Sequence, residues 1–168
     1  MQNPGENSTP ETGERDALYS LSYISRCRIP PWELAAELRH IQETSIENNR
    51  AAGLTGKLIY RHGHFVQRLE GLRYAVEETM DRIRDDHRHD NLKILSSHSI
   101  EQRMYTDLQQ LLVVTDGPEL AGLDALLGSL SIRPVQSADE SESAAMLLAL
   151  QHAPTSDNVF LPVPRSNR

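Results

Sequence analysis

Several residue types are scarce in this chain of 168 residues, and each scarcity excludes a class of protein. There is a single cysteine, Cys27, so an internal disulfide is impossible. Aromatic residues make up 5% of the chain, too few for the stacking platform of a sheet that binds RNA. The formal net charge is −7, whereas a nucleic-acid interface needs a basic stripe. We therefore expect no direct contact with nucleic acid.

Long apolar segments are also missing. No apolar run is long enough to cross a bilayer, and the polar start of the chain lacks the basic and apolar regions of a signal peptide. These absences predict a cytoplasmic protein that makes no contact with a membrane. Residues 1–16 and 154–168 are rich in polar residues and proline, and we expect both segments to be disordered.

The segments in between alternate strand and helix patterns. Strands are expected over residues 18–25, 54–61, 64–70, 92–97 and 108–114, and helices over 30–48, 72–86, 118–130 and 137–152. Two right-handed crossovers joined by a hairpin then predict an α+β fold, a ferredoxin-like βαββαββ sheet with two helices on one face. The last two helices cover the other face. We expect a sheet domain over 17–115 and a helical extension over 116–153.

Local signals fix where these elements should begin and end. Pro30-Pro31 is expected in the first turn of its helix, Asn48 at the C-terminal cap of the same helix, and His62-Gly63 in a tight hairpin turn. A capping box at Ser137–Glu140 should start the last helix. That helix is apolar all round over 144–150, which predicts contacts on more than one side and hence a homodimer or higher oligomer.

The strand over 64–70 places a polar side chain where burial is expected. Period-two alternation directs Phe65, Gln67 and Leu69 to one face. The Gln67 amide needs partners for its donors and its carbonyl oxygen, since each unpaired buried group costs roughly 1–3 kcal/mol. Tyr23 projects to the same side from the first strand, which this topology places beside the third. The two side chains should therefore meet between the two helices, where ligands often bind.

Six more polar residues are candidates for the same gap. Four of them have an ordinary alternative role: Ser45 a bond to its own backbone, Arg82 and Asp86 a solvent-exposed ion pair one helical turn apart, and Arg88 a contact with solvent or an anionic phosphate. The candidates are Ser45 and Asn49 near the end of the first helix, Arg82 and Asp86 in the second helix, and Arg88 and His89 directly after it.

Together these residues resemble the BLUF domain, a flavin-binding blue-light sensor, from Leu18 to about Arg103. The order and spacing of the matching pieces are specific, although each piece alone is weak. The pieces are Tyr23-Ile24-Ser25, the run 45–49 followed by Gly53-Leu54-Thr55-Gly56, the complete motif from Gly63 to Gly71, and Arg82-Ile83 with Asp86 and Arg88-His89.

The resemblance implies FAD bound non-covalently, with its ring between the two helices. Tyr23 and Gln67 would be the photochemical pair: on excitation an electron and a proton pass from the tyrosine toward the flavin, and the pair recombines with the glutamine amide rearranged. The implied flavin-binding residues are Tyr23, Ser45, Asn49, Gln67, Arg82, Asp86, Arg88 and His89. No residue is expected to act as an enzymatic catalyst or to bind a metal.

One part of the family pattern is missing, the Trp-x-Met of the last strand, where this chain has Leu108 and Gln110. Gln110 is a candidate to contact Gln67 in its place. Only residues 104–168 follow the matched region, so we expect a photoreceptor without enzyme activity that signals through an unknown downstream protein or an oligomer change. A light-insensitive interaction module is the alternative that the missing Trp-x-Met supports.

A metal enzyme is a third reading of the sequence, based on the pairs His62-x-His64 and His87-x-His89. It is disfavoured, because no third and fourth ligands have the spacing of a zinc site.

Overall fold

The computed structural model describes residues 17–105, 111–113, 121–130, 134, 136 and 138–152. The expected disordered segments and the positions of Leu108 and Gln110 lie outside these residues. The elements are β1 (Leu18–Cys27), α2 (Leu34–Ala51), β2 (Thr55–Arg61), β3 (His64–Leu72), α3 (Arg73–Arg84), β4 (His89–Ser99), β5 (Leu111–Val113), α4 (Ala121–Leu130) and α5 (Glu140–His152).

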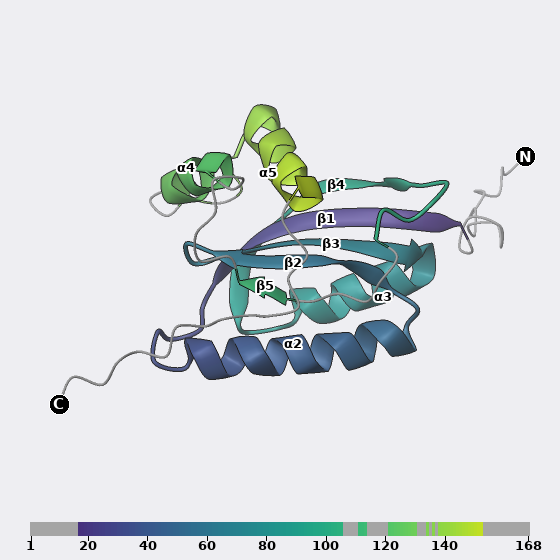
Figure 1. The fold of residues 1–168 in the computed structure, drawn as a ribbon, viewed down its shortest axis with the longest axis horizontal. Coiled ribbons are helices and arrows are strands. Elements are labelled where there is room, and N and C mark those ends of the chain that lie inside the picture. Colours follow the sequence, from purple (N-terminus) through teal and green to yellow (C-terminus); the bar gives the residue numbers. More distant parts are fainter. Residues whose placement is uncertain are drawn as a thin grey trace, which may run out of the picture.

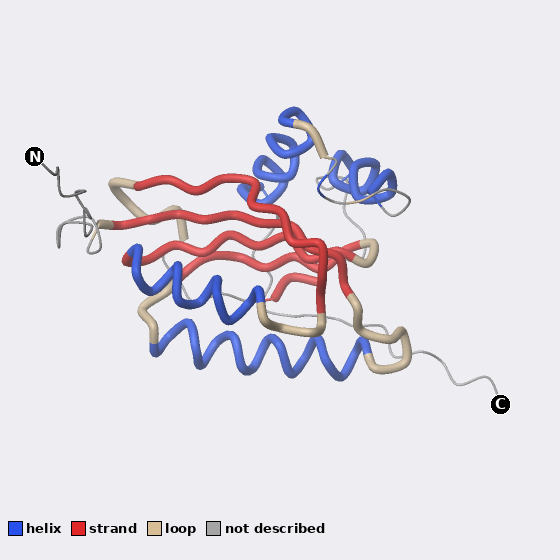
Figure 2. Tube along the Cα trace, turned by 180° about the vertical axis from the view of Figure 1, so that it is seen from behind, coloured by secondary structure: helices blue, strands red, loops and turns tan. Residues whose placement is uncertain are grey.

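The strands form one sheet in the order β4-β1-β3-β2-β5. All neighbours are antiparallel except β2 and β5, which are parallel. Figures 1 and 2 show α2 and α3 on one face of this sheet and α4 and α5 on the other. The predicted α+β ferredoxin-like fold is therefore confirmed. The division into a sheet domain and a helical extension stays a prediction.

The central strands β1 and β3 bring the two singled-out polar residues into register. Tyr23 and Gln67 are Cα partners across the antiparallel pair, so their side chains leave the sheet on the same face and side by side. The predicted turn before β3 is also present: His62 has φ 46 and Gly63 has φ 74. Two positive φ values in a two-residue loop match the twist of a hairpin, and this turn sets the register of Gln67.

The start of α2 differs from the prediction. Pro30-Pro31 lies in a turn before the helix, where the Glu33 N–H donates to the Pro30 carbonyl at 3.0 Å. The helical bonds begin only with the Glu37 N–H, which donates to the Glu33 carbonyl at 3.0 Å. The proline pair favoured a helix start, but the backbone completes a separate turn first.

The end of α2 also differs, because the helix passes Asn48 and continues to Ala51. Asn48 was expected at the C-terminal cap, but it is Gly53, with φ 64, that takes the left-handed conformation typical of a helix end. The Gly53 and Leu54 N–H groups donate to the carbonyls of Arg50 and Asn49 at 3.1 and 2.8 Å, the Schellman pattern. Glycine adopts this conformation without the penalty of a side chain, so it displaces asparagine as the terminator.

The capping box of α5 exists but starts two residues later than predicted. The Glu142 N–H donates to Asp139 Oδ1 at 2.9 Å, and the Asp139 N–H donates to Glu142 Oε2 at 2.9 Å. Asp139 is therefore the N-cap, and not Ser137, which lies outside the described residues. Both positions carry good capping residues with a glutamate three residues later, and the reciprocal hydrogen bonds between Asp139 and Glu142 identify Asp139 as the cap.

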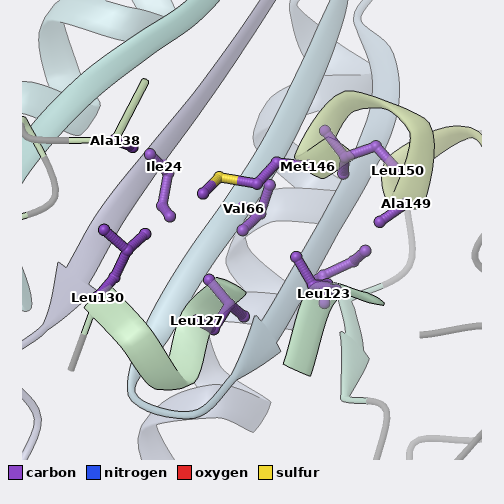
Figure 3. Close-up of a cluster of buried hydrophobic side chains, with 10 residues drawn as sticks. Ile24, Val66, Leu123, Leu127, Leu130, Ala138, Met146, Ala149 and Leu150 are labelled. Atoms are coloured by element: carbon purple, nitrogen blue, oxygen red, sulfur yellow. The ribbon is translucent and has the colours of Figure 1, made fainter. Parts of the chain in front are cut away.

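Apolar side chains fill both sides of the sheet. Ile24, Ile59 and Val66 face α4 and α5, and Figure 3 shows this back-face cluster. Burying each large aliphatic side chain contributes roughly 1.5–3 kcal/mol. On α5 itself Leu150 is fully buried, while Leu148 is 56% exposed, so one side of its apolar stretch packs on the sheet and another faces outward. No helix among the described residues is long and apolar enough to cross a membrane.

Candidate functional site

A cavity of about 210 Å³ lies between α2, α3 and the centre of the sheet. Its walls combine apolar side chains, among them Leu58, Phe65 and Ile83, with a set of polar residues. All eight residues singled out in the sequence line this one cavity: Tyr23 from β1, Ser45 and Asn49 from α2, Gln67 from β3, Arg82 from α3, Asp86 and Arg88 from the turn after α3, and His89 from the start of β4.

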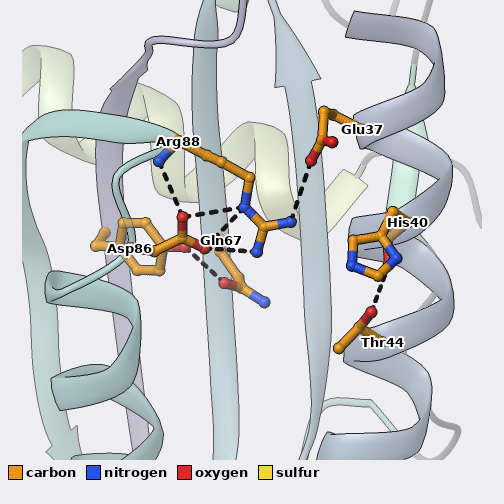
Figure 4. A network of polar contacts seen from close by, with 7 residues as sticks. Glu37, His40, Thr44, Gln67, Asp86 and Arg88 are labelled. Carbon is orange, nitrogen blue, oxygen red and sulfur yellow. Dashed lines mark hydrogen bonds and ion pairs between the residues drawn. The ribbon is translucent and has the colours of Figure 1, made fainter. Parts of the chain in front are cut away.

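Tyr23 and Gln67 are hydrogen-bonded on the floor of this cavity. The Tyr23 hydroxyl donates to Gln67 Oε1 at 2.7 Å, and the two residues are only 4% and 5% exposed. Burial, with a smaller contribution from the nearby Asp86 carboxylate, raises the pKa of Tyr23 far above its usual value. The phenol therefore keeps its proton and acts as a donor. In Figure 4 the dashed line ends on the amide oxygen of Gln67, and the amide nitrogen points to the other side.

A charged network closes one end of the cavity (Figure 4). Arg88 Nη2 lies 2.6 Å from Asp86 Oδ2, and Arg88 Nη1 lies 3.5 Å from Glu37 Oε2 on α2. Burial alone would raise the pKa of Asp86, but the hydrogen bonds and charge of Arg88 outweigh it and hold that pKa below its usual range. The carboxylate is therefore ionised, and Arg88 links α2 to the turn after α3.

This network excludes the ordinary alternative role of Arg82 and Asp86, a solvent-exposed ion pair one helical turn apart. Helix α3 ends at Arg84, so Asp86 lies beyond its last turn and pairs with Arg88. Arg82 instead donates to the Thr79 hydroxyl at 2.8 Å. Both side chains still line the cavity.

Two buried nitrogens at the cavity have no hydrogen-bond partner within the described part of the chain, Asn49 Nδ2 and His89 Nδ1. Burial lowers the pKa of His89 below its usual value, although Asp86 acts against this, so the ring is neutral. The His89 ring stacks near Tyr23, with centroids 6.4 Å apart. Unpaired buried polar atoms cost free energy. A flat, partly polar heteroaromatic ring such as a flavin therefore fits these walls.

Sequence reasoning missed three contributors to the cavity region, Glu37, Thr44 and Asn48. Thr44 and Asn48 line the cavity, and their helical spacing from Ile41 was a signal that they share its face. Glu37 was not detectable in this way, because its partner Arg88 is far away in the sequence. Two of the histidines considered as metal ligands have other contacts. His62 Nε2 lies 3.0 Å from Asp124 Oδ1, and His64 Nδ1 lies 2.8 Å from the His62 carbonyl. Among the described residues, no group of three or more His, Cys, Asp or Glu side chains is placed to hold a metal.

The family model described as sensors of blue-light using FAD matches residues 18–110, more than half of the chain. The chain belongs to the BLUF family. This is a family of flavin-binding blue-light sensors, so membership favours a sensor over the light-insensitive interaction module.

Photoactivated adenylate cyclases contain sequences similar to this BLUF chain. The alpha subunit of Euglena gracilis is 35% identical over 98 residues, which cover 58% of this chain and 9% of that protein. The beta subunit of Euglena longa is also 35% identical over 98 residues, 58% of this chain and 11% of that protein. The chain thus spans about a tenth of the length of these relatives, and the shared part is the sensor.

Solved BLUF structures have the same fold. BlrB, a BLUF protein in its dark state, is 28% identical with a TM-score of 0.60, over 80% of this chain and 97% of that one. A bacterial light-regulated adenylyl cyclase is 26% identical with a TM-score of 0.59, over 68% of this chain and 34% of that one. BlsA in its photo-activated state has a TM-score of 0.67 over 84% of this chain at 23% identity, a likeness of fold alone.

Proposed function

We propose that this BLUF chain senses blue light with FAD held non-covalently in the cavity, and that Tyr23 and Gln67 form its hydrogen-bond switch. The observation that carries the proposal is the Tyr23–Gln67 hydrogen bond of 2.7 Å at the cavity floor. When bound, a flavin supplies blue-light absorption and an excited state that oxidises a nearby phenol. The protein's part is to place that phenol, hold its proton and respond through the amide.

Gln67 suits the response because its amide carries a carbonyl acceptor and an NH₂ donor on one carbon. In the present arrangement the carbonyl accepts from Tyr23 and the nitrogen points away. Rotation or tautomerisation of the amide changes which atom faces Tyr23 and which faces the cavity. An ordinary hydrogen bond contributes about 0.5–1.5 kcal/mol, so the two arrangements are close enough in free energy for a switch.

The remaining cavity residues would orient the ligand. Asn49 Nδ2 and His89 Nδ1 are available to polar atoms of a ring, and Leu58 and Phe65 provide apolar contact. An outer cavity shares Arg82, Asp86 and Arg88 with the inner one. Guanidinium groups bind phosphate oxygens well, which favours a phosphorylated flavin, and the outer space favours FAD over shorter flavins. Release of the flavin by denaturation, followed by chromatography against FAD and FMN standards, tests this assignment.

Absorption spectra before and after blue light test the proposed sensing. The purified chain should show flavin bands that move to the red on illumination and return in the dark. Gln67→Leu and Tyr23→Phe should each retain flavin and lose the movement, because each removes one side of the hydrogen bond. Matched controls are Gln102→Leu and Tyr74→Phe, which change exposed residues of the same types. A red shift that survives in both site variants would refute the assigned pair.

The output of the switch is proposed on the same basis. The relatives join their sensor to a cyclase, and this chain aligns with the sensor part. We infer that its signal passes to an effector, as in these relatives, or changes the oligomeric state. Light scattering in the dark and under blue light distinguishes the two, since only the second changes the molar mass of the purified chain.

A further inference from the structure

A buried carboxylate lies on the face of β3 that points away from the cavity. Glu70 has no exposed surface, and its Oε1 is 2.8 Å from Nε of Arg68, which is itself largely buried. Glu70 Oε2 accepts the backbone N–H groups of Met104 at 2.8 Å and Tyr105 at 3.1 Å. Moving this backbone away would leave a buried charge short of partners, which is strongly unfavourable. The carboxylate therefore ties residues 104 and 105 to β3.

Arg103 strengthens this attachment. Its guanidinium donates to the Glu70 carbonyl and the Thr55 hydroxyl, each at 2.9 Å, and to the Gly53 carbonyl at 2.7 Å. The segment 103–105 is thus fixed to the end of β3, the start of β2 and the loop after α2. Hydrogen bonds in which the donor is charged are stronger than neutral ones, so the segment should follow any displacement of β3.

The other end of this segment contacts α5. The Tyr105 hydroxyl donates to the Leu150 carbonyl at 2.9 Å, and Leu150 lies in the last turn of the helix, where carbonyls lack partners within the helix. Burial raises the pKa of Tyr105 to about 12, so the hydroxyl remains a donor. Tyr105 therefore satisfies one of the end carbonyls of α5 with a group that is anchored to β3.

Strand β3 carries both the cavity residue Gln67 and the anchor residue Glu70. Gln67 faces the cavity and Glu70, three residues later, faces the opposite layer, so a movement of β3 displaces both. We propose that the segment 103–105, held by Glu70, couples β3 to the C-terminal turn of α5, so that rearrangement at Gln67 loosens this turn. The inference rests on the proposed function, because the light-driven change at Gln67 is its input.

A competing route runs through apolar packing. Val66, the neighbour of Gln67 on β3, belongs to the same buried cluster as Met146 and Leu150 of α5. Tyr105→Phe separates the two routes, because it removes one hydroxyl at the α5 contact and leaves the Val66 cluster in place. Tyr74→Phe is the matched control, since Tyr74 is half-exposed on α3, across the sheet from α5 (Figure 1).

Amide hydrogen exchange of the flavin-loaded chain, in the dark and under continuous blue light, tests the coupling in peptides that cover 140–152. In the parent chain, light should speed exchange in the last turn of α5 roughly 2- to 10-fold, the factor that corresponds to losing one hydrogen bond. Tyr105→Phe should keep the red shift but exchange at the fast rate in the dark, with no further effect of light. Glu70→Gln should show the same loss if it folds, and Tyr74→Phe should behave like the parent.

The outcomes separate the coupling from the sensing. An undiminished light response of α5 in Tyr105→Phe would overturn the role of the segment and favour the Val66 route. A parent chain with a red shift but no response in α5 would refute the coupling alone. A parent chain that binds flavin and shows no red shift would refute the proposed function, and the coupling with it.

Discussion

The packing of α5 on the sheet leads to a quantitative prediction. Leu150 is fully buried among Val66, Met146 and Leu127, whereas Leu148 on the same helix is 56% exposed. Leu150→Ala removes three carbons from this cluster, a loss of about 2.4 kcal/mol at about 0.8 kcal/mol per carbon. The cavity left behind adds to this, so we expect a destabilisation of about 3 kcal/mol, within the range of about 2–5 kcal/mol for such substitutions.

Urea unfolding followed by circular dichroism measures this loss, and thermal unfolding should show a midpoint lowered by roughly 6–12 °C. The control is Leu148→Ala, which changes the same residue type two positions away and should alter the free energy of unfolding by less than about 0.5 kcal/mol. The reasoning is refuted if both variants lose the same small amount, since α5 would then not be part of the cooperative core. A shallow separate transition in the parent chain would lead to the same conclusion.

Three further predictions concern the helix cap, the ligand and pH. Asp139→Ala and Glu142→Ala should each lower the free energy of unfolding, measured in urea, by about 1 kcal/mol. The double variant should lose less than the sum of the two, because the two side chains act reciprocally. Strictly additive losses would exclude the capping box. Asn49→Ala should weaken flavin binding roughly 10-fold in fluorescence titrations, the effect of losing one hydrogen bond at a buried donor, and an unchanged dissociation constant would remove Asn49 from the binding set. Burial lowers the pKa of His64 and His89 below the usual 6.5, so the unfolded chain binds more protons and the free energy of unfolding should fall as the pH drops from 7 toward 5. His64→Gln should flatten that fall, and an equally steep profile in the variant would contradict the assignment.

Much of the fold could be predicted because the sequence patterns agree with one another. Alternation along β3, the hairpin turn at His62-Gly63 and the strand–helix order all lead to the same sheet, which makes Tyr23 and Gln67 neighbours. The eight candidate residues line one cavity because the predicted order of strands and helices brings together the segments that carry them. Whether each one contacts a flavin stays a prediction.

The errors lie where two local signals compete or where a contact is distant in sequence. Asn48 and Gly53 are both good helix terminators, and the left-handed conformation went to the glycine. The predicted helix over 72–86 runs two residues past the end of α3 at Arg84, so the alternative ion pair of Arg82 with Asp86 does not form. The contact between Arg88 and Glu37 joins segments that no periodicity connects, so only the folded structure reveals it.

The alternation along β3 limits how this chain can be redesigned. Gln67 serves one layer and Glu70 the other, and the hairpin at Gly63 sets which residues face which side. Inserting or deleting one residue within the strand would send every later side chain to the opposite face. The Glu70 carboxylate would then point toward α2 and α3, and the aliphatic Leu69 would point to the face where Glu70 now pairs with Arg68. Insertions or deletions within β3 are therefore tolerable only when they involve an even number of residues; other length changes must lie outside the strand.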